Sequence, residues 1–167
     1  MKQLIQFYQN GKLLFVLIAL AIAGTTSAQQ LFEDPIIQIR KIDIAEAFNK
    51  IEVRGNVIIV LTNDLTNRVV LRGDVNDVQE ATARVKKGKL IINAIKNYNA
   101  SKFIIYLPAG SINSLATSGN TQIVSSGTIK VSDLEILLSG SSHVSIRHEG
   151  NLRITPGPGY EITEGSK

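Results

Sequence analysis

The sequence lacks cysteine and tryptophan altogether, and it has only two histidines in 167 residues. Without cysteine no disulfide can staple the fold, so stability must come from core burial or from a bound metal. The same absence excludes a lipoprotein anchored through an N-terminal cysteine and any enzyme with a cysteine nucleophile. The scarcity of histidine leaves few side chains that could serve as a general base near neutral pH.

The N-terminal region has the pattern of a secretory signal peptide. Lys2 and Lys12 flank a polar stretch, and the uncharged residues 13–23 follow. That uncharged stretch is shorter than the roughly 20 apolar residues that span a bilayer. Thr26 and Ala28 then form a small-x-small cleavage motif. The alternative is an uncleaved N-terminal anchor, which is the only membrane contact that the sequence suggests.

These signals divide the chain into three parts. We predict a signal peptide over residues 1–28, an N-terminal entry segment over residues 29–41 and one β domain over residues 42–167. A chain of this length can bury a core without disulfides. Export would place the domain in the periplasm, on the outer-membrane surface or outside the cell.

The charge distribution excludes a nucleic-acid partner. The 18 Lys and Arg residues face 14 Asp and Glu residues, and loss of Lys2 and Lys12 with the signal would bring the mature chain close to balance. Nucleic-acid binding requires a clustered basic face. The one local basic run is better explained by a solvated hairpin turn around Gly88, and it comprises Arg84, Lys86, Lys87 and Lys89.

Short runs of β-branched residues, closed by turn formers, predict an all-β fold. The runs in the first half are Val57 to Leu61, Val69 to Leu71, Leu90 to Ile92 and Phe103 to Leu107. Residues 45–48 could form one turn of helix, and no sustained helical period follows. In the second half, from Ile129 to Ile154, apolar residues alternate strictly with polar ones, which indicates strands with one buried face.

A repeat underlies this alternation. Thr117-Ser118-Gly119-Asn120-Thr121 before Ile123 recurs as Leu138-Ser139-Gly140-Ser141-Ser142 before Val144, and weakly as Thr155-Pro156-Gly157-Pro158-Gly159 before Ile162. A period of about 20 residues, with small residues at the same position in each repeat, is typical of a solenoid of stacked coils. The sequence therefore predicts a parallel β-helix-like solenoid of short strands. An antiparallel β-sandwich with similar turns is the alternative.

The order of the motifs resembles a known family. The motifs are Phe48-Asn49-Lys50-Ile51-Glu52-Val53 with Gly55, Val69-Val70-Leu71-Arg72-Gly73-Asp74, Gly88-Lys89-Leu90-Ile91-Ile92, Leu107-Pro108 and the Ser-Gly repeats. From Ile42 to Thr163 the chain resembles the "putative auto-transporter adhesin, head GIN domain" family, which is common in Bacteroidetes. The resemblance implies a right-handed β-helix-like fold, an exported location and an adhesion role. It implies no catalytic residue, cofactor or ligand.

The chain departs from that family in its turns, which are not repeated Ser-Gly-Ser-Gly, and in the small number of repeats after Gly119. A short stack has a large share of exposed ends. We therefore expect self-association or a capping tail.

Candidate catalytic and metal-binding residues are sparse. His143 and His148 lie five positions apart and would point to opposite faces of an unbroken strand, which makes them poor joint metal ligands. Asp133, Glu135 and Glu149 are the acids available for glycoside cleavage, but Asp133 follows a predicted turn and no charge is concentrated around it. We therefore predict no catalytic, cofactor or metal site and no enzyme activity.

Two further sets of residues have a structural explanation and a functional alternative. Asp74, Asn76 and Asp77 vaguely resemble a calcium loop, and a turn explains them more simply. The hydroxyls of the repeat suit tight stacking of turns and could also bind sugar hydroxyls; they are Ser118, Thr121, Ser125, Ser126, Ser139, Ser141 and Ser142. The tyrosines that could supply a ring for a sugar are Tyr98, Tyr106 and Tyr160.

The sequence predicts a non-catalytic, exported, adhesin-like binding module of the cell envelope. Its partner is unknown and would be a surface glycan or an envelope protein. A periplasmic structural or protein-interaction accessory is the first alternative, acting through exposed strand edges. A carbohydrate-active enzyme on a similar scaffold is the second.

Overall fold

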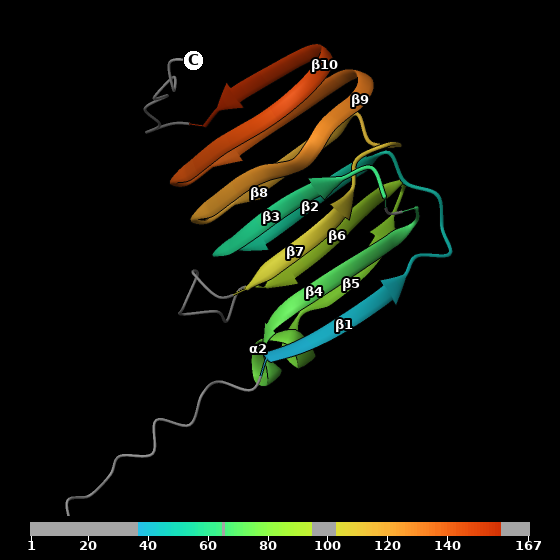
Figure 1. The fold of residues 1–167 in the computed structure, drawn as a ribbon. Helices are drawn as coiled ribbons and strands as arrows, with labels where there is room; N and C mark the ends of the chain where they lie inside the picture. Colours follow the sequence, from blue (N-terminus) through green and yellow to red (C-terminus); the bar gives the residue numbers. More distant parts are fainter. Residues whose placement is uncertain (1–36, 65, 95–102, 158–167) are drawn as a thin grey trace, which may run out of the picture. The chain divides into compact units, whose positions relative to one another are not determined.

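The fold is a single mixed β-sheet that curls into a nearly closed barrel (Figure 1). The structure is a computed structural model, and it describes residues 37–64, 66–94 and 103–157. The predicted signal peptide, its cleavage site, Tyr98 and Tyr160 lie outside the described residues. No helix of the described part is long and apolar enough to cross a membrane.

Ten strands and one short helix follow one another along the chain. They are β1 (Ile37–Asp43), β2 (Lys50–Gly55), β3 (Val57–Thr62), β4 (Arg68–Asp74), α2 (Val75–Glu80), β5 (Thr82–Lys86), β6 (Lys89–Ala94), β7 (Ile104–Pro108), β8 (Ser114–Ser118), β9 (Thr121–Ser139) and β10 (Ser142–Pro156). Their order in the sheet is β1-β4-β7-β3-β9-β8-β2-β6-β5, and β10 pairs with β9. The predicted boundary at residue 42 falls within β1.

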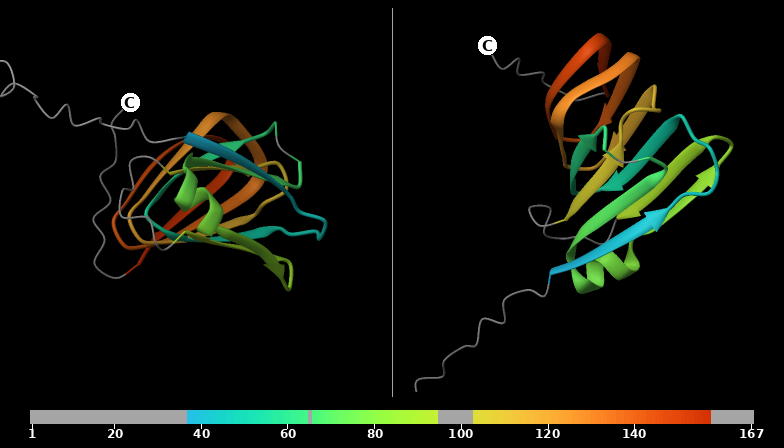
Figure 2. Two further views of the ribbon diagram at one scale, coloured as in Figure 1. Left: turned by 90° about the horizontal axis from the view of Figure 1, so that it is seen from below. Right: turned by 45° about the vertical axis from the view of Figure 1, so that its right-hand side comes forward.

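The sheet curls because β9 is long and bent. Residues 121–125 of β9 pair with β3, whereas residues 135–139 pair with β8 on the other side of the barrel. β10 follows the same path in parallel with β9, so the two strands wrap round the end of the core together (Figure 2).

The all-β prediction is confirmed, but neither predicted architecture describes the molecule. The central pairings from β7 to β6 are parallel, whereas β1 with β4, β4 with β7 and β5 with β6 are antiparallel. A parallel β-helix-like solenoid is therefore not confirmed, and one barrel-like sheet replaces the alternative of two packed sheets. The repeat occurs only in the C-terminal half, while the antiparallel pairings of β1, β4 and β5 form the rest of the sheet.

The repeated turns are nevertheless spatial neighbours. Ser118 pairs with Ser139, and Thr121 pairs with Ser142. The Gly119 amide donates to the Ser139 carbonyl at 3.0 Å, so the two Ser-Gly turns stack directly on each other. Each repeat thus adds one rung to the barrel.

Alternation fills the barrel with aliphatic side chains. The fully buried set includes Ile51, Ile59, Leu61, Leu71, Leu90, Ile92, Phe103, Ile105, Leu107, Ile112, Leu115 and Ile123. Burying each such side chain contributes about 1.5–3 kcal/mol before the opposing entropy is counted. This core replaces the disulfides that the chain lacks.

The local predictions had mixed outcomes. The hairpin around Gly88 is confirmed, because Lys86 pairs with Lys89 and the two turn residues have positive φ. The helical turn expected over residues 45–48 is wrong, since that segment has no helical hydrogen bonds. A helix forms instead over Val75–Glu80, where Asp74 caps the N-terminus by accepting a hydrogen bond from the Asn76 amide at 2.9 Å.

Glu52 on β2 is a surface carboxylate that pairs with two cations, Arg54 and Lys89. Its Oε1 accepts from Arg54 Nε at 2.6 Å, and its Oε2 pairs with Lys89 Nζ at 3.0 Å. These hydrogen bonds, Arg54 first, lower the pKa of Glu52 below its usual 4.5, despite an opposing effect of burial.

We expect Glu52→Gln to reduce the free energy of unfolding at pH 7 by about 0.5–1 kcal/mol, because both cations lie near the surface. A lowered pKa stabilises the fold above the unfolded-state value, and this contribution is lost as the pH falls through the folded-state value. The difference between variant and parent should therefore shrink at pH 3 in urea titrations. An equal difference at pH 3 and pH 7 would contradict the assignment.

Candidate functional site

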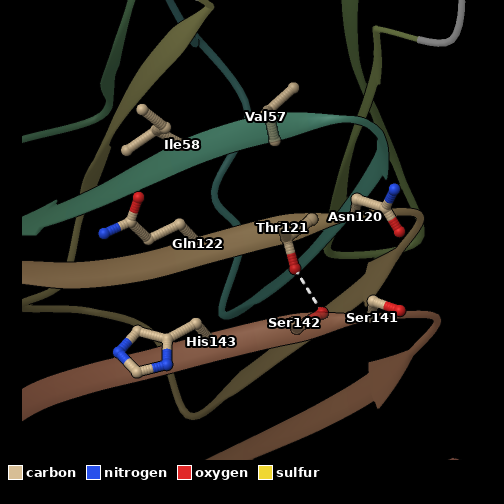
Figure 3. A pocket seen from close by; sticks show the side chains of 8 residues that line it. All are labelled: Val57, Ile58, Asn120, Thr121, Gln122, Ser141, Ser142 and His143. Carbon is tan, nitrogen blue, oxygen red and sulfur yellow. Dashed lines mark hydrogen bonds between the residues drawn. The ribbon is translucent and has the colours of Figure 1, made fainter. Parts of the chain in front are cut away.

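A shallow surface hollow of about 720 Å³ lies beside the stacked turns, where β3, β9 and β10 run side by side (Figure 3). Most of its walls are formed by residues that pair with one another on neighbouring strands. The lining residues are Val57, Ile58, Asn120, Thr121, Gln122, Ser141, Ser142 and His143.

Strand register sorts these residues into an inner and an outer column. Val57, Thr121 and Ser142 occupy one position on the three strands, and Ile58, Gln122 and His143 occupy the next. Because successive residues of a strand face opposite sides, the first column faces the core and the second faces solvent. Figure 3 shows Gln122 and His143 on neighbouring strands, with Ile58 beyond them.

Several of the repeat hydroxyls form hydrogen bonds within the fold. Thr121 Oγ1 lies 2.6 Å from Ser142 Oγ and donates to Thr117 Oγ1 at 3.3 Å. Ser125 Oγ accepts the Arg147 amide, and Ser126 Oγ donates to the Leu61 carbonyl. These hydrogen bonds support the structural explanation of the repeat hydroxyls at those positions.

The side chains of the outer column and of the adjoining turns are accessible to a ligand. Asn120, Gln122, Ser141 and His143 are exposed, and Ile58 is half-buried. The turn that carries Asn120 is held in place by the turn before β3, because the backbone amide of Asn120 donates to Asn56 Oδ1 at 2.9 Å. The hollow therefore presents amide, hydroxyl and imidazole groups on a rigid support.

An apolar strip continues the outer surface across β7, β3 and β9. Ile104 pairs with Ile58, and Tyr106 pairs with Val60, which pairs with Val124. All five side chains are half-buried and lie opposite core-facing neighbours on their strands. Tyr106 is one of the predicted ring candidates, but the sequence-based prediction did not include the strip. Its signal was available, since runs that are apolar at consecutive positions fit strands with two apolar faces.

A second, polar hollow of about 290 Å³ lies over the other side of the barrel. Asp133 and Glu135 line it together with Asn151 and Arg153, which face them in register. Asn151 Nδ2 donates to Asp133 Oδ1 at 3.0 Å. Asp133 lies within β9, so the expected turn there is wrong, and charged groups do gather around it. Glu149 pairs with Lys130 and does not line this hollow.

The two histidines lie in different environments. His143 is exposed at the first hollow, whereas His148 is half-buried opposite the core residue Ile129. The ring nitrogens of His148 are shielded from solvent and have no hydrogen-bond partner among the described residues. Within the described ranges, no three His, Asp or Glu side chains converge as a metal site.

The acids at α2 serve the helix terminus. Asp74 is the cap, and burial, together with the nearby charges of Asp74 and Glu80, raises the pKa of Asp77. Asp77 lies in the first helical turn, and its carbonyl accepts the Ala81 amide at 3.1 Å. The turn expected at Asp74, Asn76 and Asp77 is thus the start of a helix.

The family model described as "putative auto-transporter adhesin, head GIN domain" matches residues 47–154. The chain belongs to this family. The match includes both hollows, the stacked turns and most of the barrel. No curated protein matches the chain.

Crystal structures of proteins from Parabacteroides and Bacteroides are similar to this chain. A "putative lipid binding protein" from Parabacteroides distasonis is 20% identical, with a TM-score of 0.54, over 72% of this chain and 59% of that one. A "putative adhesin" from Bacteroides fragilis is 17% identical, with a TM-score of 0.50, over 72% and 62%. Another from Parabacteroides merdae is 17% identical, with a TM-score of 0.48, over 61% and 43%. This chain therefore spans 43–62% of the length of these proteins.

Proposed function

We propose that this head GIN domain is a non-catalytic, exported binding module of the cell envelope, and that its ligand is an uncharged surface glycan bound at the first hollow. The observation that carries the proposal is the outer column of Ile58, Gln122 and His143 beside exposed Asn120 and Ser141. These groups can exchange hydrogen bonds with sugar hydroxyls.

The chemistry of the hollow fits a neutral ligand. None of the described residues that line it is a carboxylate, a lysine or an arginine. Half-buried Ile58 offers an apolar contact for the C–H face of a sugar, and Tyr106 lies on the same outer surface. Binding sites commonly combine such apolar and aromatic walls with a few polar groups that fix orientation.

The same composition argues against catalysis at this hollow. Glycoside hydrolysis by the usual route needs two carboxylic groups that flank the scissile bond. The described lining supplies none, and the family model and the crystal structures are named for adhesion or lipid binding rather than for an enzyme. Export is supported by the N-terminal pattern and by the adhesin-like family.

The test is a glycan and host-matrix binding screen on the purified protein, followed by calorimetric titration of any hit. The double variant Gln122→Ala/His143→Ala should lower the affinity about tenfold or more, because it removes two hydrogen-bonding groups worth about 1 kcal/mol each. Lys130→Ala, an exposed change on the bend of β9, is the matched control and should bind like the parent.

Unchanged affinity in the double variant would overturn the assignment of this hollow. A clean negative in the screen, with folded protein, would favour the alternative role of a periplasmic protein-interaction accessory. Recovery of one stoichiometric envelope protein in a pull-down would support that alternative directly.

A further inference from the structure

β10 forms an uncovered end of the barrel in the described structure, because its pairing strand there is β9 alone. Its core-facing side chains show the consequence. Leu134 on β9 is 1% exposed, but Leu152, its neighbour in the same column, is 36% exposed. Val144, Ile146 and Ile154 are likewise only partly buried. An additional strand would complete this layer of the core.

His148 is a second indication that this layer of the core is incomplete. It faces the core beside Ile129, and both its ring nitrogens are shielded without a hydrogen-bond partner among the described residues. Shielded polar atoms of this kind are costly unless something pairs with them. A partner that covers β10 could supply the missing hydrogen bond.

The two interruptions in the pairing of β10 with β9 lie at equal sequence distances from His148. The pairing with β9 is interrupted between Ser145 and Arg147, and again between Glu149 and Asn151. Residues 146 and 150 therefore form the two corners, each two positions from His148. The straight segments 142–145 and 151–154 lie at equal distances on either side. A second copy turned by 180° about His148 would present its corners to these corners.

We propose that two copies of the chain pair through β10, antiparallel, about a two-fold axis at His148. Arg147 then faces Glu149 of the second copy, twice. Val144 faces Leu152 of the second copy, and the two His148 rings lie side by side, where one can donate to the other. Such an interface is isologous and closes as a dimer.

Charge and side-chain direction select this register over its neighbours. A slip by one residue would set core-facing side chains against outward-facing ones. Moving the axis to residue 147 would place Arg147 against itself, and moving it to residue 149 would place Glu149 against itself. Like charges directly opposite destabilise strand pairs. The axis at residue 148 sets opposite charges against each other and keeps the apolar residues together.

The first test is a charge swap read by sedimentation equilibrium. The parent protein should be dimeric, and Arg147→Glu and Glu149→Arg should each weaken the dimer about tenfold or more. The double variant Arg147→Glu/Glu149→Arg restores opposite charges and should restore the dimer. Arg72 is exposed on β4, so Arg72→Glu should leave dimerisation unchanged.

Three results would overturn the proposal: a monomeric parent protein, single variants that dimerise normally, or a double variant that fails to recover. A monomer would mean that β10 does not pair with a second copy. None of these variants changes a residue that lines the first hollow. The dimer proposal and the glycan-binding proposal can therefore be disproved independently.

The second test uses the absence of native cysteine. His148→Cys would place two thiols across the axis at a Cα separation of about 4.5–5.5 Å, which lies in the disulfide range. Mild oxidation should yield a covalent dimer. Lys130→Cys, one rung further in on β9, should remain mostly monomeric under the same conditions. Equal cross-linking of the two variants would contradict the two-fold arrangement.

Discussion

Gly119→Ala is expected to destabilise the domain by about 3 kcal/mol or more, which is a large fraction of the stability of a typical domain. Gly119 has φ +112, a conformation that residues with a side chain rarely adopt. An added Cβ would also lie 2.6 Å from the Gly55 carbonyl oxygen and 3.2 Å from Asn56 Oδ1. Both effects arise from a single methyl group.

The clash at Gly119 cannot be relieved by a local shift, because the turns form a continuous column. A Cβ on Gly140 would lie 2.6 Å from the Gly119 carbonyl oxygen, and one on Gly55 would lie 2.2 Å from that of Ala94. Each glycine thus supports the backbone of the next rung. Displacing one turn would break hydrogen bonds above and below it, such as that from the Gly119 amide to Ser139.

Gly127→Ala provides the matched control within β9. A Cβ at Gly127 would meet nothing within 4 Å, and its φ lies outside the left-handed region. The control should change the free energy of unfolding by less than about 0.5 kcal/mol. Urea denaturation followed by circular dichroism measures both variants. Similar stabilities for Gly119→Ala and Gly127→Ala would show that the column is not tightly packed.

The glycine column also shows how much of the fold could be predicted from the sequence. The resemblance between the turns at Gly119 and Gly140 is visible in the chain, and these turns do stack. The turn at Gly55 and Asn56 belongs to the same column, yet it hydrogen-bonds to a residue 64 positions away. No local pattern encodes that pairing, because it depends on how the N-terminal strands insert between later ones.

The same limit applies to architecture and site. Alternation predicts short strands from Ile129 onward, but not that one strand, β9, runs from Thr121 to Ser139 and bends to pair with β3 at one end and with β8 at the other. Antiparallel closure by β1 and β4 brings together residues separated by long stretches of chain. In the sequence, Gln122 belongs to no motif, and His143 stands out only as a poor metal ligand. They became a candidate site only when register placed them side by side.

Leu134→Ala is expected to cost about 2–5 kcal/mol, the usual range when a buried leucine leaves a cavity. Leu134 is 1% exposed on β9, and Ile136, two positions along, is completely buried. Leu152→Ala makes the same chemical change in the adjacent position on β10, where the side chain is 36% exposed. In the monomer it should cost less than about 1 kcal/mol, because less apolar area leaves the core.

Urea titrations of the two leucine variants at several protein concentrations test the uncovered end of the barrel. At low concentration the costs should differ strongly between the two positions. At higher concentration, where β10 pairs with a second copy, Leu152 becomes buried against Val144, and the cost of Leu152→Ala should rise toward that of Leu134→Ala. Equal costs at every concentration would mean that this end of the core is covered within the single chain.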